Sequence, residues 1–232
     1  MSEVLQGLLE QNILLEGIWE TLYMTLLSSL FAYLIGLPIG VILSITDETG
    51  IKANRYINTA LGFAVNIFRS IPFLILMVAM LPVAKFIVGT SLGNKAMIVM
   101  LTIAAAPYIA RMVESSLKEV DSGVVEAAQS MGANTFQIIF KVLLPEAKPS
   151  LIVGAVISTV TVLGYSAMAG TIGAGGLGKI AISYGHQKYK DDVIWTCVIF
   201  TVIIVQVLQF IGMTISKKTD KRITKRKKST SK

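Results

Sequence analysis

The residues of this sequence that could do chemistry by themselves are few, and the most suggestive group is a glycine run. The run GAGGLG contains Gly173, Gly175, Gly176 and Gly178. A glycine-rich turn can bind phosphate when it follows a buried strand and opens the helix of a βαβ unit. Here the run follows a long apolar segment instead. We therefore interpret it as a tight or re-entrant turn and not as a phosphate site.

Two further reactive residues stand alone. His186 has no Cys or His close to it in the sequence, so it is expected to be a surface histidine and not a metal ligand. Cys197, the single cysteine, falls within an apolar run and is expected to be a small buried side chain. The sequence shows no nucleophile with a base and no G-x-x-x-x-G-K-[ST] phosphate loop. It predicts no catalytic site, no metal and no cofactor.

Arg69 is a cation within the apolar region 57–89. It could brace the structure by pairing with an acid, for which Glu114 and Glu126 are candidates. It could instead line a transport path. Because charges inside membranes are usually paired, we favour the brace.

The composition indicates an integral membrane protein. Of the 232 residues, 53% are hydrophobic and only 15% are charged, with a mean hydropathy of +0.69. The net charge of +7 comes from the end of the chain: residues 217–232 hold nine basic residues and one acidic residue. This basic tail lacks interleaved aromatic residues, so anionic lipid is a better partner for it than nucleic acid.

Five apolar runs predict five transmembrane helices. They lie at about Thr21 to Ile45, from Ile71 onward, Lys95 to Arg111, Ser150 to Ile172 and Val193 to Ile215. We expect residues 52–69 to lie at the cytoplasmic interface, with Arg69 at the headgroups. Positive-inside counting places the acidic N-terminus outside and the tail inside, although Lys179, Lys188 and Lys190 in an outer loop oppose this. We predict one membrane domain over residues 1–216 and a cytoplasmic tail over residues 217–232.

The segment EAAQSMGANTFQIIFKVLLP, residues 126–145, lies between two predicted spans and has the pattern of two amphipathic helices. Val124, Ala128 and Met131 share one face of the first helix, and Gly132 is suited to end it. Asn134 or Thr135 can cap the second helix. Its apolar face is formed by Phe136, Ile139, Phe140 and Leu143. Pro145 is expected to prevent this helix from running on unbroken.

This segment resembles the EAA signature of ABC importer permeases, E-A-A-x3-G-x9-I-x-L-P. The matching residues are Glu126, Ala127, Ala128, Gly132, Leu144 and Pro145, and Val142 replaces the usual Ile. The resemblance implies an all-α integral membrane protein, similar to type I ABC importer permeases, with a coupling helix in the cytoplasmic segment 119–147. In that family the coupling helix docks into a partner ATPase, so this chain would hydrolyse no ATP itself. Glu126 could contact the ATPase or stabilise the first helical turn, and both interpretations stay open.

Two other stretches are similar to the methionine-uptake branch of these permeases. They are VNIFRSIPFLILMVAMLP (residues 65–82) and GTIGAGGLGKIAISYGHQKY (170–189). This resemblance implies import of methionine, D-methionine included, across the cell membrane. It also implies a homodimer of this chain, two copies of a cytoplasmic ATP-binding-cassette ATPase, and an extracytoplasmic methionine-binding protein. Another small hydrophobic amino acid stays open as the substrate.

Met168 is a candidate for an outer gate. It lies among the small residues Ala167, Ala169 and Gly170, which permit close helix approach. A flexible methionine could close a path at a dimer axis. A packing or lipid-facing methionine is an equal alternative.

Two other classes of function compete with the permease. A secondary transporter driven by an ion gradient usually keeps acidic or His residues within its spans and shows repeated halves. A membrane enzyme needs a catalytic constellation. Spans one, four and five contain no charge in their apolar cores, and no repeat is visible, so we favour the ABC importer permease.

Overall fold

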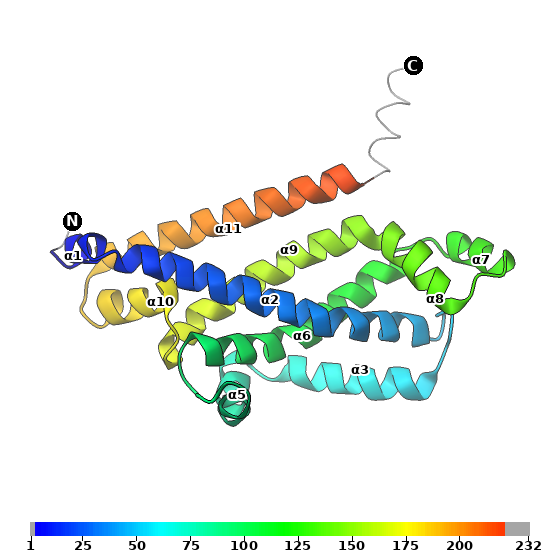
Figure 1. Cartoon of the computed structure of the whole chain (residues 1–232), viewed down its shortest axis with the longest axis horizontal. Coiled ribbons are helices and arrows are strands. Elements are labelled where there is room, and N and C mark those ends of the chain that lie inside the picture. Colours follow the sequence, from blue (N-terminus) through cyan, green and yellow to red (C-terminus); the bar gives the residue numbers. More distant parts are fainter. Residues whose placement is uncertain (1–2, 221–232) are drawn as a thin grey trace, which may run out of the picture.

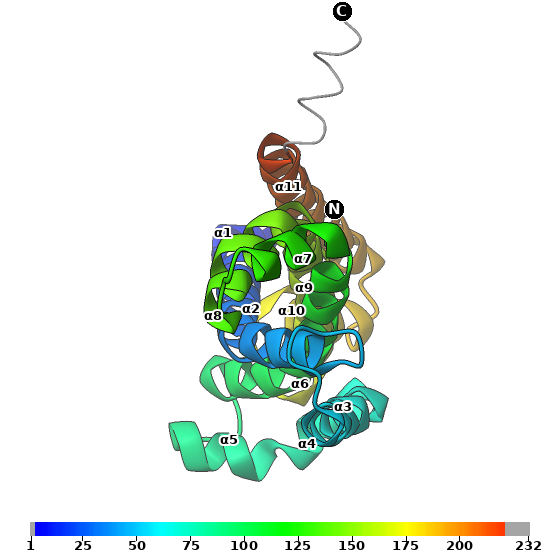
Figure 2. The same cartoon turned by 90° about the vertical axis from the view of Figure 1, so that its right-hand side faces the viewer.

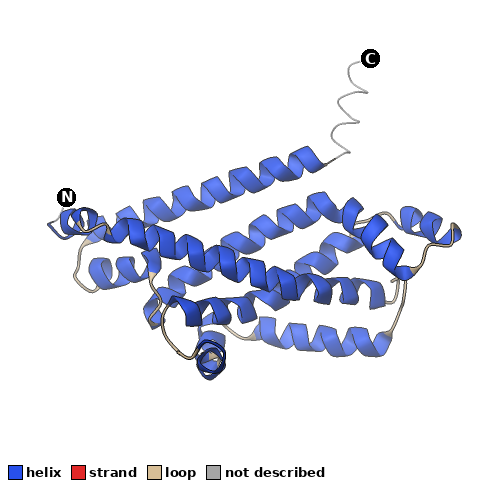
Figure 3. Ribbon diagram, viewed as in Figure 1, coloured by secondary structure: helices blue, strands red, loops and turns tan. Residues whose placement is uncertain are grey.

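The computed structural model describes residues 3–220, and every regular element in that range is a helix (Figure 3). The elements are α1 (Glu3–Glu10), α2 (Ile13–Thr46), α3 (Arg55–Ser70), α4 (Phe73–Ala79), α5 (Leu81–Val88), α6 (Asn94–Lys118), α7 (Ser122–Ser130), α8 (Thr135–Ile138), the π-helix η1 (Ile139–Leu143), α9 (Leu144–Ala169), the 3-10 turn η2 (Gly170–Ile172), α10 (Gly176–Ile180), the π-helix η3 (Ala181–His186) and α11 (Asp191–Thr219). The predicted all-α class is confirmed. Most of the basic tail, residues 221–232, lies outside the described residues.

The long helices α2, α6, α9 and α11 run along the longest axis of the molecule (Figure 1). α6 packs along α2, α9 packs on both, and α11 packs on the outer side of α9. Helices α7 and α8 lie at one end of this bundle, which we name the α7 end. The N-terminus, α1 and α10 lie at the other, which we name the α10 end (Figure 1).

The predicted number of spans is confirmed for the part of the chain that is described. Four helical stretches are long and apolar enough to cross a membrane: Ile13–Thr46, Asn94–Lys118, Thr135–Ile172 and Asp191–Thr219. The pair α3 and α4 supplies a fifth if it is one broken span. The first and third spans are longer than the apolar runs predicted, because each helix continues into a stretch that contains charged residues.

Close packing of α2 on α6 depends on small residues. A Cβ atom at Gly36 would lie 2.8 Å from the carbonyl oxygen of Ala106, and one at Gly40 would lie 2.5 Å from that of Ala110. Such contacts would force the helices apart. Small residues spaced four apart therefore let these two backbones approach, as in other membrane helix pairs.

The expected interfacial position of residues 52–69 is wrong. Helix α3 runs beside α2 and packs on both α2 and α6, and the chain then bends by 103° into α4 (Figures 1 and 2). Two polar residues of α3 form hydrogen bonds with the neighbouring helices. Asn58 donates to the carbonyl oxygen of Leu43 at 2.8 Å, and Asn66 accepts from Arg111 at 3.0 Å. Paired amides of this kind can be placed inside a membrane domain.

The glycine-rich outer loop is also largely helical. After a turn at Gly173, which has a φ of +98°, residues 176–186 form α10 and η3. The tight turn expected from the glycines is confirmed, but it is confined to residues 173–175. Helix α10 packs against α2 and α9, so this segment belongs to the body of the molecule at its α10 end.

Candidate functional site

The first candidate site is the segment 119–147 at the α7 end. Asp121 caps α7 by accepting a hydrogen bond from the Gly123 amide at 2.7 Å. Gly132 ends the helix in the left-handed region, with a φ of +80°, as predicted. Asn134, one of the two predicted caps, forms a capping box with Gln137. Local sequence signals therefore define both ends of α7 and the start of α8.

One side of this segment is anchored and the other is free. Ala128, Ile138, Ile139 and Leu143 are buried against the main core. Met131 and Phe136 are 82% and 70% exposed, and Phe136 packs on the exposed Phe140 with 4.4 Å between ring centroids. Each of the two predicted apolar faces is therefore only partly buried. The remaining apolar surface stands free at the α7 end.

Pro145 does not end the second helix. The chain stays helical from Thr135 to Ile172, and the α-helical pattern is replaced by a π-helical turn over η1, immediately before Pro145. Proline lacks the amide that an α-helix needs, and a π-turn is one way in which a helix accommodates an irregularity. The second amphipathic helix and the span α9 therefore form one continuous element. A displacement of the segment can pass directly into the membrane domain.

The residues of the EAA pattern are spread around this segment. Glu126 and Ala127 are exposed, whereas Ala128 is 5% exposed. Val142 and Leu144 are half-buried on the core, and Pro145 is exposed. Glu126 lines a cavity of about 440 Å³ that separates α7 from the turn between α2 and α3. The structure therefore spreads the seven residues from α7 to the start of α9 and does not gather them into a single contact surface.

A polar network, which the sequence did not predict, underlies the segment. Glu114 is 6% exposed and forms ion pairs with Arg111 at 2.6 Å and Lys118 at 3.0 Å. Lys118 also pairs with Asp47 at 2.9 Å, in the turn that follows α2. Arg111 donates to the Gly62 carbonyl and to Asn66 on α3. The network thus ties α2, α3 and α6 together at the α7 end.

This network overturns one prediction about Arg69. Glu114, a candidate partner for Arg69, is paired with Arg111 and Lys118 instead. Within residues 3–220, Arg69 forms no ion pair and no hydrogen bond, with Glu126 or with any other group. The brace that we favoured is therefore not formed in this structure.

The same network affects the titration of Asp47. The hydrogen bond from Lys118 stabilises the charged carboxylate and holds the pKa of Asp47 below its ordinary value of 3.8. Partial burial acts in the opposite direction and is the smaller effect. The ion pair with Lys118 therefore favours the ionised form of Asp47.

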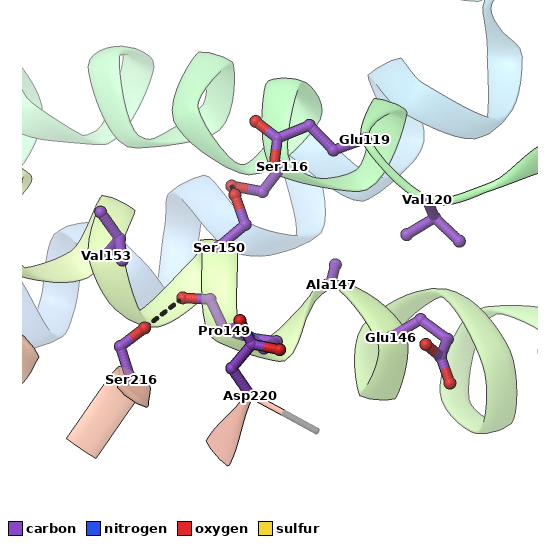
Figure 4. A pocket seen from close by; sticks show the side chains of 10 residues that line it. All are labelled: Ser116, Glu119, Val120, Glu146, Ala147, Pro149, Ser150, Val153, Ser216 and Asp220. Atoms are coloured by element: carbon purple, nitrogen blue, oxygen red, sulfur yellow. Dashed lines mark hydrogen bonds between the residues drawn. The ribbon is translucent and has the colours of Figure 1, made fainter. Parts of the chain in front are cut away.

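A second cavity, of about 320 Å³, lies between α6, α9 and the end of α11 (Figure 4). Ser150 bonds to Ser116 at 3.1 Å, and Ser216 donates to the Pro149 carbonyl at 3.0 Å (Figure 4). Glu119, Glu146 and Asp220 also line it. These two hydrogen bonds join α9 to α6 and to α11, so we interpret this cavity as a joint between three helices.

At the α10 end, another polar cluster holds the glycine-rich turn. The Glu20 carboxylate accepts hydrogen bonds from the Asn94 side chain and from the Gly176 amide, both at 2.7 Å. The Asn94 side-chain oxygen accepts from the Gly175 amide, and the Thr21 hydroxyl oxygen accepts from the Leu177 amide. The Gly176 amide is thus bound by the protein's own carboxylate, and the Gly175 amide by the side-chain oxygen of Asn94.

The remaining candidates lie apart from these clusters. Met168 is 48% exposed near the α10 end of α9, beside buried Ala169 and Gly170. His186 is exposed at the end of η3. Cys197 is 3% exposed, as expected for a buried side chain.

Comparison with known proteins decides the family. The family model for the inner membrane component of binding-protein-dependent transport systems matches residues 36–225. The chain belongs to this family. The match includes the EAA segment and both flanking spans, so the family resemblance inferred from that segment is confirmed.

The relatives most similar in sequence include permeases named for methionine transport. The probable D-methionine transport system permease MetI of Vibrio cholerae is 49% identical over 92% of this chain and 95% of its own length. The methionine import system permease MetP of Bacillus subtilis is 47% identical over 91% of this chain and 97% of its own length.

Solved structures agree with the fold. A chain of the inward-facing methionine ABC transporter MetNI is 48% identical and superposes with a TM-score of 0.90, over 95% of this chain and all of that one. A chain of an amino acid ABC transporter solved with histidines has a TM-score of 0.76 at 18% identity, which supports the fold alone. The predicted architecture, similar to type I ABC importer permeases, is confirmed.

Proposed function

We propose that this chain is the membrane-spanning subunit of an ATP-driven importer of methionine. The proposal rests on two observations taken together. Part of the apolar surface of segment 119–147 is exposed, and methionine permeases are relatives over nine-tenths of the chain. Membership in a binding-protein-dependent family favours this class over an ion-gradient carrier. D-methionine is included as a substrate because several relatives are named for it.

The partners follow from the same reasoning. A cytoplasmic ATPase docks on the exposed side of segment 119–147, where Glu126, Ala127 and the aromatic pair Phe136 and Phe140 are accessible. Two copies of this chain, two copies of the ATPase and an extracytoplasmic methionine-binding protein make up the importer. Five spans per chain are too few to enclose a wide path, which supports the homodimer. Closure of the ATPase dimer would move the segment and, through the continuous helix into α9, the membrane domain.

The orientation is proposed from charge. Lys52, Arg55, Lys141 and Lys148 lie on elements at the α7 end, and the basic tail follows α11. Cytoplasmic loops carry an excess of Lys and Arg, so the α7 end and the tail face the cytoplasm. The N-terminus then lies outside, together with Met168 as the proposed outer gate. Anionic lipid of the cytoplasmic leaflet would hold the tail.

The test is uptake of radiolabelled methionine by vesicles that contain this chain with its ATPase and binding protein, with and without ATP. We expect ATP-dependent uptake that unlabelled methionine competes away. ATP-driven uptake of another amino acid, without methionine uptake, would keep the permease and replace the substrate. Uptake that needs no ATPase would contradict the proposal altogether.

A further inference from the structure

Arg69 lies further from the membrane surface than the sequence indicated. It lines a cavity of about 140 Å³ together with residues of α4, α6 and α9. The α6 residues of this cavity are Ala104 and Tyr108, which stand about ten residues from Asn94 and from Lys118, the two ends of α6. At a rise of about 1.5 Å per residue, the cavity is about 15 Å from either end. This is mid-depth in a hydrocarbon core about 30 Å thick.

A cation at this depth needs a polar partner. Placing an arginine at the bilayer centre costs about 2.5–3.5 kcal/mol or more when it faces lipid. Arg69 is exposed at the bend between α3 and α4, and no group within residues 3–220 pairs with it. Acidic residues are absent from the described lining of the cavity. The guanidinium is thus available to a ligand.

The walls of this cavity suit an amino acid with an apolar side chain. Phe73 of α4 stacks on Tyr165 of α9, with 4.2 Å between ring centroids and 7° between the ring planes. Tyr108 and Phe68 complete an aromatic surround. Methionine sulfur makes favourable contacts with aromatic rings, and an arginine fork binds a carboxylate through two parallel hydrogen bonds.

The volume limits what can enter. An apolar cavity of about 150 Å³ holds benzene. The cavity at Arg69 is of this size, so one protomer encloses part of an amino acid and leaves the remainder in the open mouth. A binding site that transport must also empty is expected to enclose its ligand incompletely.

From these observations we propose that Arg69, with Tyr108 and Tyr165, forms a mid-membrane subsite that binds the α-carboxylate of the transported amino acid. The proposal rests on the proposed function for the class of ligand. It assigns to Arg69 a binding role in place of the structural ion pair. The bend between α3 and α4 is the feature that presents Arg69 to the cavity.

The test measures binding without the binding protein, which recognises the substrate itself. Cys197 is the only cysteine, so Cys197→Ala combined with Ala104→Cys gives a single reporter in the cavity lining. The permease–ATPase complex in detergent is treated with a maleimide at increasing methionine concentrations. We expect methionine to slow the labelling of residue 104. Methionine amide, which lacks the carboxylate, should protect at least about tenfold less well, because a charge-assisted bond changes affinity by that factor or more.

Variants at Arg69 test whether its guanidinium binds the carboxylate. Arg69→Gln should raise the half-protecting methionine concentration about tenfold or more, and Arg69→Lys by less, because it keeps the charge but loses the fork. Arg55→Gln, an exposed arginine at the other end of α3, should leave protection unchanged. Equal protection by methionine and its amide on the unsubstituted Arg69 complex, or no protection, would overturn the proposal even if the Arg69 variants failed to assemble.

The same preparation, supplied with binding protein in vesicles, separates this proposal from the proposed function. ATP-dependent methionine uptake without protection of residue 104 would overturn the subsite and leave the function standing. Protection by another α-amino acid through Arg69, without methionine uptake, would support the carboxylate subsite and replace the substrate.

Discussion

The side-chain amide of Asn94 donates a hydrogen bond of 2.7 Å to the carboxylate of Glu20, a residue 74 positions earlier in the chain. The other oxygen of that carboxylate accepts from the Gly176 amide, and the Asn94 oxygen accepts from the Gly175 amide. The three segments α2, α6 and the start of α10 are therefore joined in one closed set of bonds. A Cβ on Gly175 would collide with the Glu20 carboxylate, so a side chain here would have to displace that carboxylate from its bonds.

Replacing Glu20 tests this anchor. Glu20→Ala removes two accepting oxygens and leaves the Gly176 amide and the side-chain N–H group of Asn94 without a partner. A charge-assisted hydrogen bond contributes about 1.5–3 kcal/mol, so we expect a loss of at least about 2 kcal/mol in the free energy of unfolding. Thermal unfolding in detergent measures it. Glu16→Ala, an exposed residue one turn earlier on α2, is the control. Equal shifts for both variants would show that the bonds contribute nothing measurable.

The lowered pKa of Asp47 predicts that the thermal stability of the protein depends on pH. Because the pKa is lowered in the folded state, the ion pair with Lys118 stabilises the protein fully at a pH above the ordinary value of 3.8. The contribution disappears as the pH falls through the lower, folded-state pKa. We expect the difference in melting temperature between the wild type and Asp47→Asn to be constant above about pH 5 and to shrink below about pH 4. Since such partly exposed pairs contribute about 1 kcal/mol or less, the difference is small. A difference that grew on acidification would contradict this assignment.

The sequence predicted what is encoded locally. The cap at Asn134, the left-handed Gly132 and the apolar runs of α2, α9 and α11 all depend on residues close together in the chain, and each is where it was expected. The family could also be predicted from the sequence, because the residues of the EAA pattern lie within one short stretch of the chain.

What the sequence did not predict depends on long-range pairing. Helix α3 was placed at the interface to keep Arg69 at the headgroups, and the bonds of its amides to α2 and α6 exist only once those helices pack beside it. The partners of Glu20 were missed for the same reason, whereas those of Glu114 lie on its own helix. A weak signal existed for Glu114: Arg111 and Lys118 stand three residues before and four after it, which is the spacing of ion pairs on one helix face.

The exposed aromatic pair on segment 119–147 predicts how the ATPase docks. Phe140→Ala removes a side chain that is 54% exposed, so we expect little loss of stability but weaker binding of the ATPase, by about 2 kcal/mol if this is an interface hot spot. Ile139→Ala, at the adjacent buried position, should instead lower the melting temperature. Co-purification with the ATPase and thermal unfolding give the two readouts. Full ATPase binding by a stable Phe140→Ala protein would place the dock elsewhere.

Gly132 predicts a conformational requirement at the coupling segment. A Cβ here would meet nothing within 4 Å, so a substitution is opposed by the φ of +80° and not by space. The left-handed conformation costs a residue with a side chain about 1–2 kcal/mol, and a β-branched residue more. Gly132→Val should therefore uncouple ATP hydrolysis from transport while the loaded binding protein still docks, whereas Gly132→Asn should retain most coupling. The ratio of methionine imported to ATP hydrolysed is the measurement. Normal coupling in Gly132→Val would contradict the proposed role of the segment.

Met168 predicts a gate that can be made to leak. Its side chain is half exposed in one protomer, whereas its neighbours Ala169 and Gly170 are buried, so it is free to meet a second copy across the dimer axis. Met168→Ala shortens a flexible apolar plug, and we expect vesicles to leak preloaded methionine or the complex to hydrolyse ATP without substrate. Met213→Ala on α11, with a similar exposed fraction of 39%, controls for the loss of a surface methionine. If Met168 forms the gate, only Met168→Ala should raise the leak of methionine or the rate of ATP hydrolysis. Identical leak and ATPase rates in the two variants would mean that Met168 packs against lipid or protein and closes nothing.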